Sequence, residues 1–232
     1  MNILGLIPAR GGSKGILHKN RKLLAGKPLL QYTIDAALGA TELDAVVFSS
    51  EDDTLIELAE RSGVRVPFKR PKELATDTAK SIDVVLHALG ALSEKGEHYD
   101  AVCLLQVTTP FRTAADIDAA LQKFKLSNVD SLITVLEVPH KYNPHWVFEA
   151  ENETLRIATG EQEIISRRQE LPPAYIRDGA IYITKTEVLR DKKSFFGTRL
   201  GYLLSDDSKH VNIDTMEDWG RAERILSGES LE

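Results

Sequence analysis

The sequence predicts an α/β fold in which helices cover a parallel sheet. From the start of the chain to about Glu137, short runs rich in branched apolar residues alternate with segments of helical periodicity. This alternation is typical of strand-helix-strand units, which place successive strands parallel in one sheet. The composition agrees, because 42% of the 232 residues are hydrophobic and 28% are charged, a balance typical of folded globular proteins. A disordered or collagen-like chain is thereby excluded.

Strands and helices are predicted from two different periodicities. Five apolar runs are predicted as strands: Ile3–Ile7, Ala45–Ser49, Val64–Phe68, Ala101–Gln106 and Ser131–Val138. Four segments with apolar residues at three- and four-residue intervals are predicted as the crossover helices: Pro28–Leu38, Thr54–Arg61, Ser81–Ser93 and Ala114–Phe124. In such a sheet the ligand binds beyond the carboxyl ends of the strands, so the loops that follow the strands are the candidate site.

The pattern changes after Glu137. Residues 139–173 are polar and mixed in pattern, and they contain Asn143–Trp146 and the pair Pro172–Pro173, which indicates an insertion that serves as a dimerisation arm. Gly179–Thr184 then returns to a strand-like run. Thr215–Asp218 is typical of a capping box and predicts a last helix that ends at Leu226. Residues 1–232 are therefore predicted as a single domain with an arm at about 139–173.

Charge and cysteine content restrict the compartment and the partners. The chain has 29 Lys and Arg against 35 Asp and Glu, a net charge of −6, and its scattered basic residues disfavour nucleic-acid binding. Cys103 is the only cysteine, which excludes an intrachain disulfide and disfavours a cysteine-ligated zinc site. No apolar run is long enough for a bilayer, and Met1–Leu4 lacks the basic start of a signal peptide. We expect a cytoplasmic protein without membrane or nucleic-acid partners.

A glycine-rich turn, Pro8–Gly15, follows the first predicted strand. Glycines let backbone N–H groups approach a phosphate, and Arg10 and Lys14 add positive charge. The turn is not a Walker A loop, because Lys14 follows Ser13 and precedes Gly15 instead of standing in G-K-[ST], and it is not a G-x-G-x-x-G fingerprint. It predicts a triphosphate site, and the alternative is a glycine turn with solvated basic side chains.

Several further motifs resemble, in chain order, those of the acylneuraminate cytidylyltransferases. The matching segments are Ile7–Gly15, Lys19–Asn20, Leu24–Leu29, Arg70–Asp77, Leu104–Arg112, Arg168–Pro172, Asp178–Ile183 and Ile213–Thr215. They span nearly the whole chain, and several motifs in one order are more specific than any single motif. The resemblance implies a Rossmann-like nucleotidyltransferase sheet with helices on both faces. It also implies a reaction that joins CTP to a nine-carbon 2-keto sugar acid and releases pyrophosphate.

The resemblance assigns nucleotide-binding roles to particular residues. The CTP phosphates would be held by Arg10, Ser13, Lys14, Lys19 and Asn20, with Arg70 and Ser81 also facing the nucleotide. These assignments agree with the attraction of phosphates for cations and backbone amides. For Arg70 the alternative is a solvated loop charge. The implied catalytic residues are Lys14, Gln106 and Asp214.

The sugar acid has its own implied residues. Gln106 ends a buried run and matches a glutamine that contacts the sugar, and its alternative role is a cap on loose backbone groups. Arg168 matches an arginine that meets the sugar carboxylate, a role suited to a planar guanidinium. Trp146 and the pair Phe195–Phe196 are the other implied sugar-side residues. In the family dimer the arm helps to close the sugar pocket, so we expect a homodimer.

The resemblance also implies Mg²⁺ as the cofactor. Magnesium would neutralise charge on the phosphates while the anomeric hydroxyl of the sugar attacks the α-phosphorus. The family's Asp-x-Asp metal pair reads Asn212-Ile213-Asp214 here, so the predicted ligands are Asp214 and the neutral Asn212, and weaker metal binding is expected. The alternative is that Asn212 bonds a neighbour and the metal relies on Asp214, with Asp206 or Asp207.

Two more departures bear on which sugar is used. Trp146 stands where a lysine is expected, and Asp178 replaces a common asparagine. Together with Phe195–Phe196, the indole predicts a more apolar pocket, which favours legionaminic or pseudaminic acid over sialic acid. Core packing of the arm is the alternative role for Trp146. For the whole chain, the alternatives are a cytidylyltransferase for the eight-carbon acid Kdo and a nucleotide-binding module without catalysis.

Overall fold

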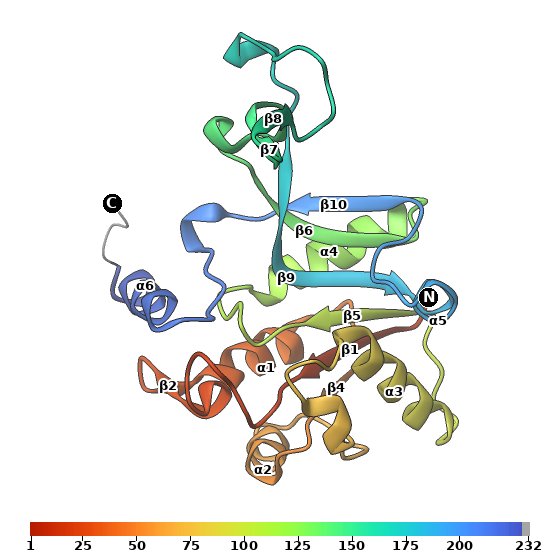
Figure 1. Cartoon of the computed structure of the whole chain (residues 1–232). Helices are drawn as coiled ribbons and strands as arrows, with labels where there is room; N and C mark the ends of the chain where they lie inside the picture. Colours follow the sequence, from red (N-terminus) through yellow and green to blue (C-terminus); the bar gives the residue numbers. More distant parts are fainter. Residues whose placement is uncertain (229–232) are drawn as a thin grey trace.

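The computed structural model describes residues 1–228, and within them a six-stranded sheet forms the centre of the molecule (Figure 1). Its strands are β1 (Ile3–Pro8), β4 (Ala45–Ser49), β5 (Ala101–Leu105), β6 (Ser131–Glu137), β9 (Tyr175–Lys185) and β10 (Leu200–Leu204). The strand order is β10-β6-β9-β5-β1-β4. β1 pairs parallel with β4 and β5, and β6 pairs parallel with β10, whereas β9 runs antiparallel between β5 and β6. One antiparallel strand therefore joins two parallel parts of the sheet.

Helices cover both faces of this sheet, as predicted. They are α1 (Leu29–Gly39), α2 (Asp53–Arg61), α3 (Ser81–Ser93), α4 (Ala114–Leu126), α5 (Thr186–Lys192) and α6 (Met216–Ser227). α1, α2, α4 and α6 contribute to one buried core with Ile7 and Cys103, and α3 and α5 contribute to a second core with Leu6 and Leu104. Strands buried on both faces need apolar side chains at successive positions, which explains the continuous apolar runs. Within residues 1–228, no helix has the length and apolar composition needed to cross a bilayer.

Two capping boxes fix the starts of α4 and α6. The predicted box is confirmed, because Thr215 Oγ1 accepts from the Asp218 N–H at 3.2 Å and Asp218 Oδ2 accepts from the Thr215 N–H at 2.7 Å. Asp218 Oδ2 also accepts the N–H of Asp214 at 3.0 Å. The cap of α6 therefore holds the backbone of Asp214 as well, a residue with a predicted metal role.

The strand predicted at Val64–Phe68 is wrong. Only Arg65 forms a bridge, with Val47, within the described part of this segment. Pro67 has no N–H to give to a neighbouring strand, which limits the pairing of this run. The edge strand β10 is present although the apolar pattern did not predict it, and Gly201 is its second residue.

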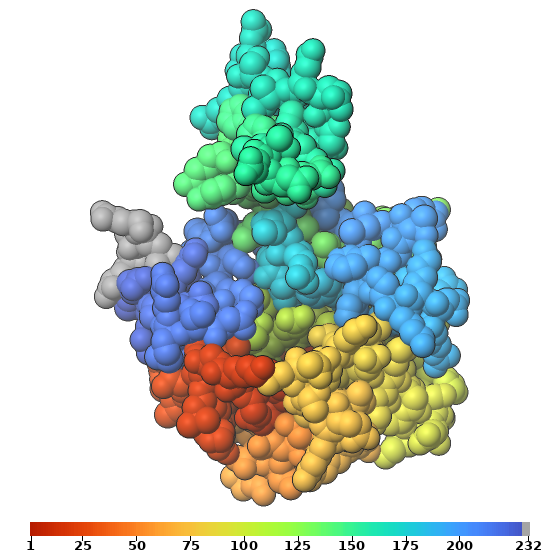
Figure 2. Space-filling model, viewed as in Figure 1, coloured from red at the N-terminus to blue at the C-terminus, as the bar shows by residue number. Residues whose placement is uncertain are grey.

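Residues 139–173 form an arm that projects from the body of the molecule (Figures 1 and 2). The chain leaves the sheet after β6 and returns at the start of β9, whose first residues rise toward the arm (Figure 1). The arm contains a hairpin of β7 (Phe148–Glu151) and β8 (Thr154–Ile157), and short 3₁₀ turns. A smaller hairpin, β2 (Leu23–Leu24) with β3 (Lys27–Pro28), precedes α1.

Candidate active site

A cavity of about 310 Å³ lies where β1 and β5 end and α3 begins, and we call it the strand-end cavity. Its position agrees with the general rule for ligand sites in open α/β sheets. Most residues with predicted nucleotide or catalytic roles line it: Arg10, Ser13, Lys19, Asn20, Arg70, Ser81, Gln106 and Asp214. The structure therefore brings together residues from distant parts of the sequence that the motifs had linked only by resemblance.

Close backbone packing explains two glycines of the turn after β1. A Cβ on Gly15 would lie 2.2 Å from the backbone oxygen of Asp214, and a Cβ on Gly11 would lie 2.3 Å from Asp52 Oδ2. The N–H of Gly11 donates to Glu51 Oε1 at 2.8 Å. This amide is therefore used inside the protein and is not free for a phosphate.

Lys19 and Asn20 fix the other side of the turn. The Lys19 side chain is 9% exposed, and its Nζ donates to the backbone oxygen of Ile213 at 2.6 Å and to Asp214 Oδ1 at 3.0 Å. Asn20 Nδ2 donates to the backbone oxygen of Arg10 at 2.9 Å. These bonds hold the first 20 residues against the segment before α6, so the ammonium of Lys19 has a fixed place in the cavity wall.

Asp77 is a site residue to which the sequence analysis gave no role. Its Oδ1 lies 2.9 Å from Arg10 Nη2, and its Oδ2 lies 3.0 Å from Lys14 Nζ. The Lys14 ammonium, together with Arg10, holds the pKa of the Asp77 carboxyl below its ordinary value. Lys14 does not line the cavity itself, and Asp77 connects it to the residues that do. The available signal was the carboxylate at the end of the quoted motif Arg70–Asp77.

Arg70 is buried, so its alternative role as a solvated loop charge is wrong. The guanidinium donates to the backbone oxygens of Ala9, at 2.7 Å, and Ser49, and Nε donates to Ser49 Oγ at 3.2 Å. Burial lowers the pKa of Arg70 to about 10, an effect that the charge of Glu51 opposes. Arg70 thus joins the ends of β1 and β4 beneath the cavity.

Arg112 fixes the loop that follows β5. It is buried, and its guanidinium donates to the backbone oxygens of Gln106 and Ala180 and, at 3.0 Å, to Thr109 Oγ1. Burial lowers the pKa of this guanidinium to about 10. Gln106 therefore receives a hydrogen bond at its backbone, while the residue itself lines the strand-end cavity. The sequence analysis quoted Arg112 in a motif but assigned it no role.

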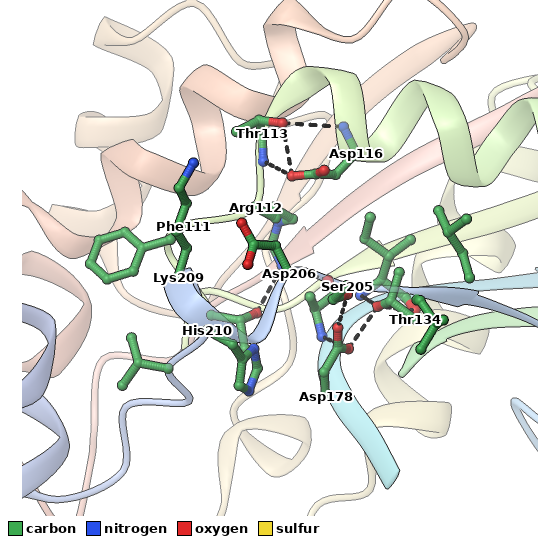
Figure 3. Close-up of a pocket in the computed structure, with 16 residues that line it drawn as sticks. Phe111, Arg112, Thr113, Asp116, Thr134, Asp178, Ser205, Asp206, Lys209 and His210 are labelled. Atoms are coloured by element: carbon green, nitrogen blue, oxygen red, sulfur yellow. Dashed lines mark hydrogen bonds between the residues drawn. The ribbon is translucent and has the colours of Figure 1, made fainter. Parts of the chain in front are cut away.

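A second cavity, of about 220 Å³, lies beside the start of α4 and the end of β10 (Figure 3). Asp178 lines it, and its carboxylate accepts from Thr134 Oγ1 at 2.6 Å, from the Ala180 N–H at 2.8 Å and from Ser205 Oγ (Figure 3). All three partners donate, so a carboxylate suits this position without further rearrangement. Asp178 links β6, β9 and the end of β10.

The predicted metal pair lies at the edge of the strand-end cavity. Asn212 Nδ2 donates to Asp214 Oδ2 at 3.1 Å, while Asp214 Oδ1 receives Lys19. The Asp214 side chain is 62% exposed, so it is accessible to a ligand. The sequence analysis gave, as an alternative to metal binding, that Asn212 bonds a neighbouring residue, and this bond is present.

Apart from Gln106, the predicted sugar-side residues lie outside the strand-end cavity. Trp146 and Arg168 are in the arm, Phe195 and Phe196 pack near Tyr182, and none of the four lines the strand-end cavity of residues 1–228. The indole N–H of Trp146 donates to the backbone oxygen of Ile165 at 2.5 Å, a contact inside the arm. Arg168 is exposed. One chain therefore brings most of the predicted nucleotide residues together with Gln106, and leaves the other four predicted acceptor residues apart.

Comparisons with known proteins identify the family of this chain. A model of the cytidylyltransferase family matches residues 4–224. The chain is 33% identical over 227 residues to CMP-N,N'-diacetyllegionaminic acid synthase of Legionella pneumophila, covering 97% of both proteins. It is 33% identical over 218 residues to pseudaminic acid cytidylyltransferase of Campylobacter jejuni, covering 94% of this chain and 93% of the relative.

Solved structures with low sequence identity share the fold. CMP:2-keto-3-deoxy-manno-octonic acid synthetase complexed with CTP superimposes with a TM-score of 0.73 at 15% identity, covering 98% of this chain and 99% of the other. 4-Diphosphocytidyl-2C-methyl-D-erythritol synthase of Anaerococcus prevotii gives a TM-score of 0.67 at 14% identity, covering 97% and 96%. At these identities the likeness shows the fold alone.

Proposed function

The chain belongs to the cytidylyltransferase family, and from this premise we propose that it transfers CMP from CTP to a sialic-acid-like nonulosonic acid and releases pyrophosphate. The observation that carries this proposal is the 33% identity, over 97% of both proteins, to an enzyme named for making a CMP-linked legionaminic acid. As a member of this family the chain is a nucleotidyltransferase, so the alternative of a binding module without catalysis is set aside.

We assign the triphosphate of CTP to the strand-end cavity. Arg10 and Lys19 in its wall supply positive charge, and Lys14 adds charge beside it through its pair with Asp77. Charge-assisted hydrogen bonds to phosphate are among the stronger contacts in proteins. Lys19 is held in place by Ile213 and Asp214, so little ordering is needed when the nucleotide binds. Ser13, Asn20 and Ser81 add polar groups to the same wall.

We assign the sugar acid to the space between this cavity and the arm of a second chain. Gln106 lies in the cavity, whereas Arg168 lies in the projecting arm. The arm also exposes large apolar side chains, including Phe148, Leu155 and Ile164, which a second copy would cover. A homodimer explains both features, because each arm can then bring Arg168 and Trp146 to the other chain's site.

Among sugar acids we favour legionaminic or pseudaminic acid. The relatives that share 33% identity with nearly all of this chain are named for these two acids. The CMP:2-keto-3-deoxy-manno-octonic acid synthetase shares only 15% identity, so it argues for the fold and not for Kdo. The indole N–H of Trp146 bonds within the arm, so we assign the apolar part of the sugar pocket mainly to Phe195 and Phe196, which pack near Tyr182.

The residues at the cavity edge fit a magnesium ion that arrives with the nucleotide. Mg²⁺ is usually held by one or two carboxylates together with substrate phosphates and water. The exposed carboxylate of Asp214 fits the first role, and Asn212 beside it would orient that carboxylate or add an amide oxygen. When bound, the ion would neutralise phosphate charge and make the α-phosphorus more electrophilic.

The chain's own groups would act mainly by positioning and electrostatics. Gln106 would orient the sugar so that its anomeric hydroxyl stands in line with the bond between the α- and β-phosphates. The attacking hydroxyl oxygen forms the new bond to the α-phosphorus and gives up its proton to solvent, and pyrophosphate leaves with the electrons of the broken bond. Arg10, Lys14 and Lys19 would stabilise the charge that develops on the departing pyrophosphate.

Pyrophosphate release tests this proposal. The protein is mixed with Mg²⁺, CTP and one of four acids: N-acetylneuraminic, N,N'-diacetyllegionaminic, pseudaminic or Kdo. We expect release with legionaminic or pseudaminic acid at a higher kcat/KM than with the other two, and little release when UTP or ATP replaces CTP. Fastest turnover with Kdo would contradict the proposed substrate class, and no turnover with any acid would contradict the proposed function.

A further inference from the structure

One side chain already occupies the cations that we assign to the triphosphate. Asp77 places one carboxylate oxygen 2.9 Å from Arg10 Nη2 and the other 3.0 Å from Lys14 Nζ. The carboxylate thus faces each cation with a different oxygen. Two non-bridging oxygens of a phosphate would contact Arg10 and Lys14 in the same way. Arg10 Nη1 donates in addition to the backbone oxygen of Thr76 at 3.0 Å, so the residue before Asp77 takes part.

A polyphosphate and Asp77 cannot hold these cations at the same time without like-charge repulsion. The Asp77 and Lys14 side chains are 42% and 79% exposed, and ion pairs between exposed groups contribute little to stability. Contacts to phosphate are stronger because they combine several charges with fixed donors. The nucleotide should therefore displace Asp77, at a modest cost in its own affinity.

The cost falls on whichever ligand uses Arg10 and Lys14. CTP carries β- and γ-phosphates, and pyrophosphate consists of those same two groups once the bond to the α-phosphorus is broken. CMP keeps only the α-phosphate, so it does not compete with Asp77 if Arg10 and Lys14 hold the outer phosphates. Of the two products, Asp77 therefore weakens the binding of pyrophosphate and not that of the CMP-linked sugar.

We propose that Asp77 is a positioning residue that competes with the outer phosphates for Arg10 and Lys14 and so promotes the departure of pyrophosphate. This inference rests on the proposed function, since it takes the strand-end cavity as the CTP site. The carboxylate acts through the two cations and does not touch the reacting atoms. Its return to Arg10 and Lys14 replaces the contacts that pyrophosphate gives up.

The test compares Asp77→Asn with the unmodified chain by calorimetry, with pyrophosphate, CTP and CMP as separate ligands at one magnesium concentration. The amide removes the charge but keeps the shape, so we expect affinity for pyrophosphate and for CTP to rise by about tenfold, equivalent to about 1.4 kcal/mol. Affinity for CMP should stay within about twofold. In turnover assays, inhibition by added pyrophosphate should begin at a correspondingly lower concentration.

Two variants control the comparison. Asp35→Asn, on α1, breaks an exposed ion pair with Lys27 of β3 and changes the net charge by the same amount, and it should leave all three affinities unchanged. Asp77→Glu keeps the negative charge and should restore affinities close to those of the unmodified chain. A purely structural role for Asp77 would not separate pyrophosphate and CTP from CMP.

The outcomes distinguish this inference from the proposed function. Tighter pyrophosphate binding by Asp77→Asn, with CTP bound by no variant, would count against the proposed function alone. Unchanged or weaker binding of pyrophosphate and CTP by Asp77→Asn would overturn the inference, because Asp77 would then merely orient the cations. An equal gain for CMP would also overturn it, since the effect would not be confined to the outer phosphates.

Discussion

The strand-end cavity and the arm differ in how each is held together. At the cavity, hydrogen bonds join residues far apart in sequence, as when Lys19 donates to Ile213 and Arg70 donates to Ala9. In the arm, the bond from Trp146 to Ile165 stays within the arm itself. The cavity is thus part of the buried fold, whereas the arm is a small unit that projects from it (Figure 2). This contrast fits our proposal that one chain preorganises the nucleotide site while a second chain completes the acceptor site.

We expect the largest loss of activity from Gly15→Ala, because Gly15 packs closely against the backbone of Asp214 at the strand-end cavity. The new Cβ would lie 2.2 Å from the backbone oxygen of Asp214, so the turn and the segment before α6 must separate. Displacements of about 1 Å in a positioned site cost about a hundredfold in rate, and we expect a loss of kcat/KM of at least that size. Steady-state kinetics measures it. Gly90→Ala on α3, where a Cβ meets nothing within 4 Å, should keep full activity.

Lys14→Ala should weaken CTP binding while leaving the fold intact. The side chain is 79% exposed, so its removal leaves no buried gap. Loss of one charge-assisted contact should cost about 1.5–3 kcal/mol, or about 10- to 150-fold in Kd for CTP. Calorimetry measures this, with Lys69→Ala, which breaks an exposed pair with Asp53, as the control. Equal CTP affinity in Lys14→Ala and the unmodified chain would remove Lys14 from the site.

Arg168→Lys, in the arm, should impair use of the sugar acid and leave use of CTP unchanged. An ammonium lacks the planar pair of donors that a carboxylate accepts, so KM for the sugar acid should rise by about tenfold. KM for CTP should change little. Arg167→Lys is the matched control, because Arg167 is exposed and pairs with Glu170 at 3.5 Å. If only KM for CTP moves, Arg168 faces phosphate and the division of roles is wrong.

Asn212→Asp should give the smallest effect, a change in the magnesium requirement, and it tests whether position 212 contacts the metal. A second carboxylate beside Asp214 should lower the magnesium concentration that gives half the maximal rate by about threefold, because ligand charge governs affinity for hard cations. Affinity for CTP should change little. A magnesium titration of both proteins decides, and an identical midpoint would place position 212 outside the metal shell.

The sequence predicted those strands and helix ends that depend on neighbouring residues along the chain. Continuous apolar runs identified β1, β4, β5 and β6, and the Thr215–Asp218 pattern identified the start of α6. The strand at Val64–Phe68 failed because Pro67 restricts pairing. The antiparallel insertion of β9 between β5 and β6 depends on long-range pairing, and the apolar pattern alone gives no direction to a strand.

The candidate site shows the same limit. Arg10, Lys19 and Gln106 were found because their motifs resemble those of a known family, and the structure places them around one cavity. Asp77 and Arg112 received no role, because their informative contacts are long-range. Asp77 pairs with Lys14, 63 positions away, and Arg112 donates to the backbone oxygen of Ala180, 68 positions away. No local sequence pattern reveals such contacts. Their importance becomes visible only from the ion pairs and buried hydrogen bonds of the folded chain.

The central claim is that each complete site combines the cavity of one chain with the arm of another. A dimer of two differently tagged chains tests it, one carrying Lys14→Ala and the other carrying Arg168→Ala. In a two-fold symmetric dimer with exchanged arms, one of the two sites in this mixed dimer contains both substitutions and the other contains neither.

Pyrophosphate release by the purified mixed dimer, compared with each variant alone, is the decisive measurement. The account predicts that both single-variant dimers are nearly inactive at low CTP and sugar concentrations, and that the mixed dimer recovers about half the activity of the unmodified protein. A mixed dimer no more active than the average of the two variants would contradict the account, because Lys14 and Arg168 would then serve the same chain's site.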